Sequence, residues 1–124
     1  MSKKIIVAED SSVIQNLTKK ILSQLNYQIK SVKNGQQVLD LLDKEAYHLI
    51  LLDIHMPVMD GMECAQSIRK SGKEYKDIPI IAITGNANNY TEAEFEAAGI
   101  NAFVPKPLNY DSLVEKVKEF TNDD

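Results

Sequence analysis

The feature that most constrains the fold is a regular alternation of short apolar runs with segments of helical periodicity. Four runs of three or four residues are almost entirely apolar: Ile5–Ala8, Leu49–Leu52, Ile80–Ile83 and Ala102–Val104. Short, nearly continuous apolar runs are typical of strands that are covered on both faces, as in a parallel sheet. A fifth run, Tyr27–Val32, contains several polar residues, which favours a strand at the edge of the sheet.

Segments with the periodicity of helices lie between these runs. In four segments, apolar residues recur at intervals of three or four, which predicts helices with one apolar face. These stripes comprise Val13, Leu17, Ile21 and Leu25, widened by Ile14 and Leu22; Val38, Leu41 and Leu42; Met62, Ala65 and Ile68; and Leu113, Val117 and Phe120. A fifth helix is marked by a capping box at Thr91–Glu94 and should end at Gly99.

Five strands alternating with five helices predict an α/β fold, a doubly wound parallel sheet with helices on both faces. Parallel crossovers are right-handed, so both faces are covered only if the strand order reverses. With the polar second strand at an edge, the order becomes 2-1-3-4-5, which is flavodoxin-like and has its switch point between the first and third strands. We expect one such domain over residues 1–124.

Composition excludes several classes of protein. The formal net charge is −4, so no broad basic surface is expected for nucleic acid. No apolar run approaches the roughly 18 residues that a membrane helix needs. The single cysteine, Cys64, excludes an internal disulfide, and the two histidines, His48 and His55, are too few for a typical histidine-based metal site. We therefore expect a cytoplasmic protein without membrane or direct nucleic-acid contacts.

Acidic residues follow two of the predicted strands. The first strand ends in Glu9 and Asp10, and the third ends in Asp53. Taken singly, Asp10 could cap a helix, Glu9 could be a solvated strand end and Asp53 could begin a turn. Together at the switch point, the three carboxylates would repel one another. A divalent cation that prefers oxygen ligands would relieve this repulsion, which favours Mg²⁺, with Mn²⁺ as the alternative.

Thr84 and Lys106 belong to the ends of the fourth and fifth strands, at the same edge of the sheet. A hydroxyl and an ammonium in these positions can contact phosphoryl oxygens, whereas each residue alone could be an ordinary turn hydroxyl or a solvated cation. A carboxylate nucleophile at Asp53, a divalent cation, a hydroxyl and an ammonium would form a phosphoryl-transfer site.

These motifs resemble the receiver domain of two-component response regulators. The resemblance covers essentially the whole chain, and the matching segments are Glu9–Asp10, Leu51–Gly61, Pro79–Thr84 and Lys106–Pro107. It implies that Asp53 is the phosphorylated aspartate. Glu9 and Asp10 match the acidic pair that holds the metal, together with the Asp53 carboxylate and the backbone carbonyl of His55.

The resemblance also implies a conformational switch. Thr84 and Lys106 match residues that contact the phosphoryl group, Phe103 matches an aromatic residue that changes rotamer, and the Lys106–Pro107 bond is typically cis. Three departures are mild: Glu9 stands where Asp is common, Phe103 where Tyr is frequent, and Gly85 where Ala is common.

A signalling switch is therefore expected, not an enzyme with a separate substrate. It would catalyse only its own phosphorylation and dephosphorylation. By the resemblance, the phosphoryl donor is a sensor histidine kinase or a histidine phosphotransfer protein. Because the sequence stops shortly after the last helix, output is expected through contact with a downstream protein. The predicted surface comprises the fourth helix, fifth strand and fifth helix, and should involve Ala87, Tyr90, Phe103 and Tyr110.

Three other functions remain open from the residues alone. A flavin or nucleotide protein of the same fold would need a glycine- or hydroxyl-rich phosphate loop where Glu9–Ser12 stands. A phosphatase with an aspartyl nucleophile would normally carry a second catalytic acid near Asp53, which is followed instead by Ile54 and His55. A degenerate receiver that acts only in binding would lack part of the acid, threonine and lysine set.

Overall fold

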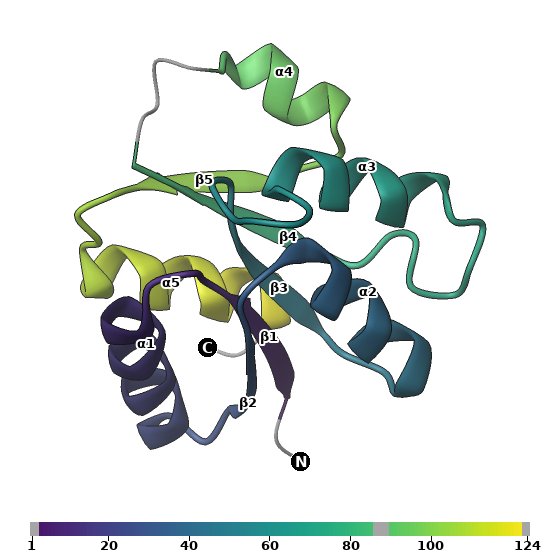
Figure 1. The fold of residues 1–124 in the computed structure, drawn as a ribbon. Coiled ribbons are helices and arrows are strands. Elements are labelled where there is room, and N and C mark those ends of the chain that lie inside the picture. The colour runs from purple at the N-terminus through teal and green to yellow at the C-terminus, as the bar shows by residue number, and fades with distance from the viewer. Residues whose placement is uncertain (1–2, 86–89, 123–124) are drawn as a thin grey trace.

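The computed structural model describes residues 3–85 and 90–122 and contains one parallel sheet with helices on both faces (Figure 1). Along the chain, the elements are β1 (Lys4–Ala8), α1 (Ser12–Gln24), β2 (Gln28–Val32), α2 (Gly35–Lys44), β3 (Leu49–Asp53), α3 (Gly61–Lys70), β4 (Ile80–Thr84), α4 (Glu92–Ala97), β5 (Ala102–Pro105) and α5 (Tyr110–Thr121). The strand order is β2-β1-β3-β4-β5, so the predicted fold class and order are confirmed.

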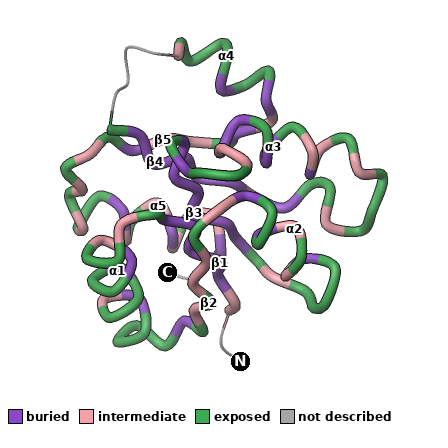
Figure 2. The backbone as a smooth tube through the Cα atoms, viewed as in Figure 1, coloured by how far each residue is buried: buried purple, intermediate pink, exposed green. Residues whose placement is uncertain are grey.

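The sheet separates two hydrophobic layers. Alternate strand residues point to opposite faces, so Ile6 and Ile50 pack with α2, α3 and α4, whereas Ile5 and Leu49 pack with α1 and α5. All five residues of β3 and of β4 are buried, which explains why the first four residues of each strand are apolar (Figure 2). β2 is exposed or half-buried along its length and forms an edge, as its polar residues predict.

Local polar contacts fix the helix ends. Thr91 and Glu94 form the predicted capping box at the start of α4, and Gly99 follows its end with a φ of +86°. The Ser11 hydroxyl accepts a hydrogen bond from the backbone N–H of Ile14 and caps α1, so Asp10 is not the capping residue. Within the described residues, no helix has the length and apolar character required to cross a membrane.

The predicted apolar face of α1 is only partly buried. Leu22 of the predicted stripe is buried, but Val13 is 77% exposed and Leu17 is 45% exposed, and the polar residues Gln15 and Thr18 are buried instead. A spacing of four residues drifts by about 40° per step around a helix, so the long stripe turns away from the sheet. The buried polar residues have partners: the Gln15 amide donates to the backbone carbonyls of Glu9 and Val32.

Candidate functional site

Two acidic residues meet at the carboxyl ends of β1 and β3. Glu9 follows β1 directly, and Asp53 is the last residue of β3. Ala8 lies opposite Leu52 in the parallel pairing, so the two acids are the next neighbours along these strands. Their exposures are only 1% and 2%, a rare environment for carboxylates unless a partner compensates the charge.

Lys106 is that partner. Its Nζ lies 3.1 Å from Glu9 Oε1 and 3.3 Å from Asp53 Oδ2, so one ammonium contacts both acids. The backbone N–H of Lys106 donates to the carbonyl of Thr84 at 2.8 Å, which ties the end of β5 to the end of β4. The Lys106–Pro107 bond is cis, as predicted. Charged residues at the ends of three strands, β1, β3 and β5, therefore lie in contact with one another.

Two backbone N–H groups donate hydrogen bonds to the carboxylate oxygens that do not contact Lys106. The N–H of Ser11 donates to Glu9 Oε2 at 2.9 Å, and the N–H of His55 donates to Asp53 Oδ1 at 3.1 Å. Glu9 Oε1 is buried and accepts no hydrogen bond of good geometry, although the Lys106 ammonium is close to it. This oxygen therefore retains capacity for a further positively charged ligand.

The charges at the site shift one another's proton affinity. Burial raises the pKa of Glu9; the Ser11 N–H opposes this shift, and the nearby Asp53 carboxylate adds to it. Burial disfavours the charged form of Lys106, but the Glu9 and Asp53 carboxylates together outweigh burial and raise the pKa of the ammonium. One ammonium faces two carboxylates, so an excess of negative charge remains.

Asp10 does not join this buried cluster. It is exposed and lies immediately before Ser11 at the start of α1. In residues 3–85 and 90–122, no three acidic, histidine or cysteine side chains are arranged as a ready metal site. The structure thus brings together two of the three predicted carboxylates and leaves the third exposed to solvent beside them.

The donor atoms present nevertheless suit a small, hard divalent cation. The residues offer carboxylate oxygens, one of them buried without a hydrogen bond, and two acids held close together. Mg²⁺ commonly takes only one or two carboxylates and keeps several waters, so a full protein cage is not required. The predicted metal therefore fits the residues found here.

Thr84 and Phe103 occupy different surroundings. Thr84 ends β4 and is buried, one residue beyond the position that pairs with Asp53. Phe103 is half-buried on the α4 side of β5, where its ring stacks on Phe95 with centroids 5.2 Å apart. The two residues lie on neighbouring strands that lead from the acidic site to α4. Tyr90 contacts Phe95 in turn, whereas Ala87 lies outside the described residues.

Sequence reasoning missed Gly61 as a positioning residue. It begins α3, and a Cβ there would lie 2.6 Å from the backbone carbonyl oxygen of Asp53 and 2.8 Å from the Cα of Ile54. Only glycine lets α3 start this close to the end of β3. The sequence does contain an indication of this role, because Asp60 is a typical helix-capping residue and Gly61 follows it directly.

A family model of the response regulator receiver domain matches residues 5–118. The chain belongs to this family. As a receiver domain, it is a component of two-component signalling, and the predicted family and signalling role are confirmed. Glu9, Asp53, Thr84 and Lys106 lie at the ends of four strands, at one edge of the sheet, and their roles in phosphoryl transfer stay predictions.

Relatives include both long and short proteins. The chain is 36% identical over 115 residues to the CAI-1 autoinducer sensor kinase/phosphatase CqsS of Vibrio cholerae, covering 93% of this chain and 17% of that protein. It spans only 5 to 17% of the length of the histidine kinases it matches. It is also 28% identical over 123 residues to the polar-differentiation response regulator DivK of Brucella anthropi, with 99% of each chain covered.

Solved structures agree with the fold and include a metal-bound example. The receiver domain of sensor histidine kinase PA1611 from Pseudomonas aeruginosa is 28% identical, with a TM-score of 0.88 over 98% of this chain and 99% of that one. That structure holds a magnesium ion coordinated in its active-site cleft.

Proposed function

We propose that Asp53 accepts a phosphoryl group from a phosphohistidine on a sensor histidine kinase or a histidine phosphotransfer protein. The observation that carries this proposal is the burial of Asp53 at a strand end between Glu9 and the Lys106 ammonium. A carboxylate held there can attack phosphorus, and its surroundings supply both fixed geometry and positive charge.

The chemistry is a displacement at phosphorus. A bond forms between an Asp53 carboxylate oxygen and phosphorus, the bond from phosphorus to the donor imidazole nitrogen breaks, and that nitrogen keeps the electron pair. The Lys106 ammonium, now 3.3 Å from Asp53, is close enough to contact a phosphoryl oxygen after transfer. The Thr84 hydroxyl, at the neighbouring strand end, would donate to another such oxygen.

The metal would be held by the carboxylates of Glu9, Asp10 and Asp53 and by the backbone carbonyl of His55. When bound, Mg²⁺, or Mn²⁺ in its place, supplies positive charge that offsets the charge of the phosphoryl group. Glu9 and Asp53 already lie together, and Asp10 would have to approach them from its exposed position.

The readout would pass through Thr84, Lys106 and Phe103 to a downstream protein. Phosphorylation adds about −1.5 to −2 charges and three acceptor oxygens. Thr84 and Lys106 are linked through their backbones, and Phe103 stacks on α4, so a shift at the strand ends has a route to that helix. The domain, over residues 1–124, would act in the cytoplasm and catalyse only its own phosphorylation and dephosphorylation.

Intact mass spectrometry tests the acceptor. Incubation with acetyl phosphate and Mg²⁺ should add the mass of one phosphoryl group to the wild type and none to Asp53→Ala. Asp40→Asn changes an exposed aspartate on α2 and should be labelled like the wild type. Labelling of Asp53→Ala at the wild-type level would place the acceptor elsewhere.

A further inference from the structure

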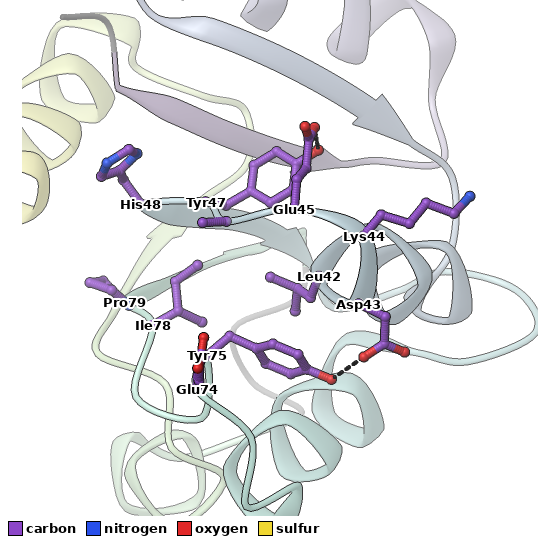
Figure 3. Close-up of a pocket in the computed structure, with 11 residues that line it drawn as sticks. Leu42, Asp43, Lys44, Glu45, Tyr47, His48, Glu74, Tyr75, Ile78 and Pro79 are labelled. Atoms are coloured by element: carbon purple, nitrogen blue, oxygen red, sulfur yellow. Dashed lines mark hydrogen bonds between the residues drawn. The ribbon is translucent and has the colours of Figure 1, made fainter.

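A cavity lies at the opposite end of the sheet from Asp53. It has a volume of about 650 Å³ and is formed by the segments that lead into β3 and β4 (Figure 3). β3 runs from Leu49 beside this cavity to Asp53, a rise of roughly 13 Å at 3.3 Å per residue. The volume falls within the range typical of sites for small molecules.

The cavity has an apolar floor and two aromatic walls. Leu42 and Ile78 are buried and form the floor with Pro79. Tyr47 and Tyr75 lie on opposite sides of Leu42 and Ile78 in Figure 3. A flat apolar body could therefore rest on the floor and contact an aromatic ring.

Each tyrosine is held in place by the same kind of cluster. The Tyr47 hydroxyl donates to Glu45, whose carboxylate also pairs with Lys4, and the Lys4 ammonium lies 5.6 Å from the Tyr47 ring centroid. On the other wall, Tyr75 donates to Asp43, as the dashed line in Figure 3 marks. Both rings are thus ordered before any ligand arrives, which lowers the entropic cost of binding.

The contacts of Tyr75 match those of Tyr47. Asp43 pairs with Lys73, and the Lys73 ammonium lies 5.8 Å from the Tyr75 ring centroid. The two carboxylates of the walls are therefore already neutralised. Glu74, which also lines the cavity, has no hydrogen bond or ion pair within the described part of the chain. The Lys44 ammonium extends away from both rings in Figure 3.

We propose that this cavity binds a small planar organic cation, of the amidine or guanidine class. The floor and the two rings cover a flat apolar body, and the carboxylate of Glu74 offers an acceptor that a planar cation can reach with paired N–H donors. An anion would meet the carboxylate of Glu74, and a neutral ligand would gain only the apolar contacts. The inference does not depend on phosphorylation of Asp53.

The test uses three probes of the same shape: benzamidine, benzamide and benzoate. Benzamidine should shift backbone amide signals within residues 42–48 and 74–79 saturably, in a roughly millimolar range for so small a ligand. Benzamide should bind more weakly, and benzoate weakest of the three. Equal binding of benzamide and benzamidine, or shifts that map to the Asp53 end of the sheet, would overturn the proposal.

Variants identify the contacts. Glu74→Gln should weaken benzamidine about two- to fivefold, the range of an exposed ion pair, and leave benzamide unchanged. Glu115→Gln alters an exposed acid on α5 and should change neither. Tyr75→Leu should weaken both probes, whereas Asp53→Ala should affect neither. Unchanged benzamidine affinity in Glu74→Gln would remove the basis for a cation site.

Discussion

The Lys106 ammonium lies 3.3 Å from Asp53 Oδ2 and simultaneously contacts Glu9, so a single cation pairs with two buried acids. Removing it should destabilise the metal-free protein. Breaking a fully buried ion pair costs about 3–5 kcal/mol, and because the Lys106 side chain is 23% exposed we expect about 1–2 kcal/mol for Lys106→Ala.

Urea unfolding with and without Mg²⁺ measures this effect. Mg²⁺ should restore part of the lost free energy of unfolding, because it compensates the same carboxylates. Lys70→Ala removes an exposed lysine of α3 and should leave the free energy of unfolding nearly unchanged. Equal stability of Lys106→Ala and wild type would mean that the ammonium contributes little to holding the two acids.

Asp10 is exposed, so we expect it to matter for metal binding and hardly at all for folding. Asp10→Asn should weaken Mg²⁺ affinity by at least the roughly 10- to 100-fold that loss of a residue supporting a metal typically costs. The unfolding free energy in a chelator should change by less than about 0.5 kcal/mol.

Mg²⁺ titrations followed by amide chemical shifts give the affinity for each protein. Asp111→Asn, at an exposed aspartate in the first turn of α5, is the matched control. If Asp10→Asn bound Mg²⁺ like the wild type, then Glu9 and Asp53 would be the sufficient carboxylate ligands.

Val58 holds an unfavourable backbone conformation in the loop after β3. Its φ is +67° although it is β-branched, and its side chain is 83% exposed, so little packing offsets the strain. Such a conformation costs of order 1–3 kcal/mol for a residue other than glycine. Val58→Asn should therefore raise the free energy of unfolding by about 1 kcal/mol, since asparagine tolerates the left-handed region.

Urea unfolding of Val58→Asn against Val13→Asn separates strain from polarity. Val13 is also exposed, at 77%, but lies in the regular helix α1. Its replacement should bring no gain, because asparagine forms helices no better than valine. A similar gain in both variants would show that surface polarity, not backbone strain, is responsible.

The fold was predictable because the burial and length of a strand determine the pattern of apolar and polar residues in its sequence. β3 and β4 are covered on both faces and begin with four consecutive apolar residues, while the polar residues of β2 marked the edge. The inner face of α1 was not predictable from hydrophobicity. Gln15 and Thr18 are buried because they find hydrogen-bond partners at Glu9, in β2 and in α5, and the partners in β2 and α5 are distant in sequence.

The site was predictable in its location and less so in its contacts. Parallel strands place their ends at one edge, so Glu9, Asp53, Thr84 and Lys106 could be grouped from strand positions alone. That Lys106 pairs with both acids, and that Asp10 remains exposed, depends on side-chain conformation. Sequence patterns of apolar and polar residues do not encode such contacts.

Substitution of Gly61 tests whether α3 must lie this close to Asp53. An alanine Cβ there would meet the Asp53 carbonyl oxygen at 2.6 Å, and backbone atoms cannot swing aside. Gly61→Ala should lower the free energy of unfolding by about 1–3 kcal/mol and slow phosphorylation by acetyl phosphate. Gly85→Ala is the control, because a Cβ at Gly85 would lie 3.6 Å from its nearest neighbour, an ordinary contact. If Gly61→Ala were destabilised but phosphorylated at the normal rate, Gly61 would be required for folding and not for positioning Asp53.

Thr84 is the proposed link between the phosphoryl group and the surface of α4, β5 and α5. A hydroxyl drawn toward the phosphoryl group would move the end of β4, and Phe103, stacked on Phe95 of α4, is the neighbouring group that such a movement can reach. The change is a shift between two populations, so its size is limited by how much better the phosphoryl group binds the active arrangement.

Amide chemical shifts with beryllofluoride and Mg²⁺, a mimic of the phosphorylated state, test this link. In the wild type, changes should extend from Asp53 to Tyr90, Phe103 and Tyr110. Thr84→Val keeps the shape but removes the hydroxyl, so changes should stay near Asp53, whereas Thr84→Ser should restore their full extent. If Thr84→Val responded as widely as the wild type, the hydroxyl would not carry the signal. If even the wild type responded only around Asp53, the domain would pass its phosphoryl group onward without a change of shape at α4.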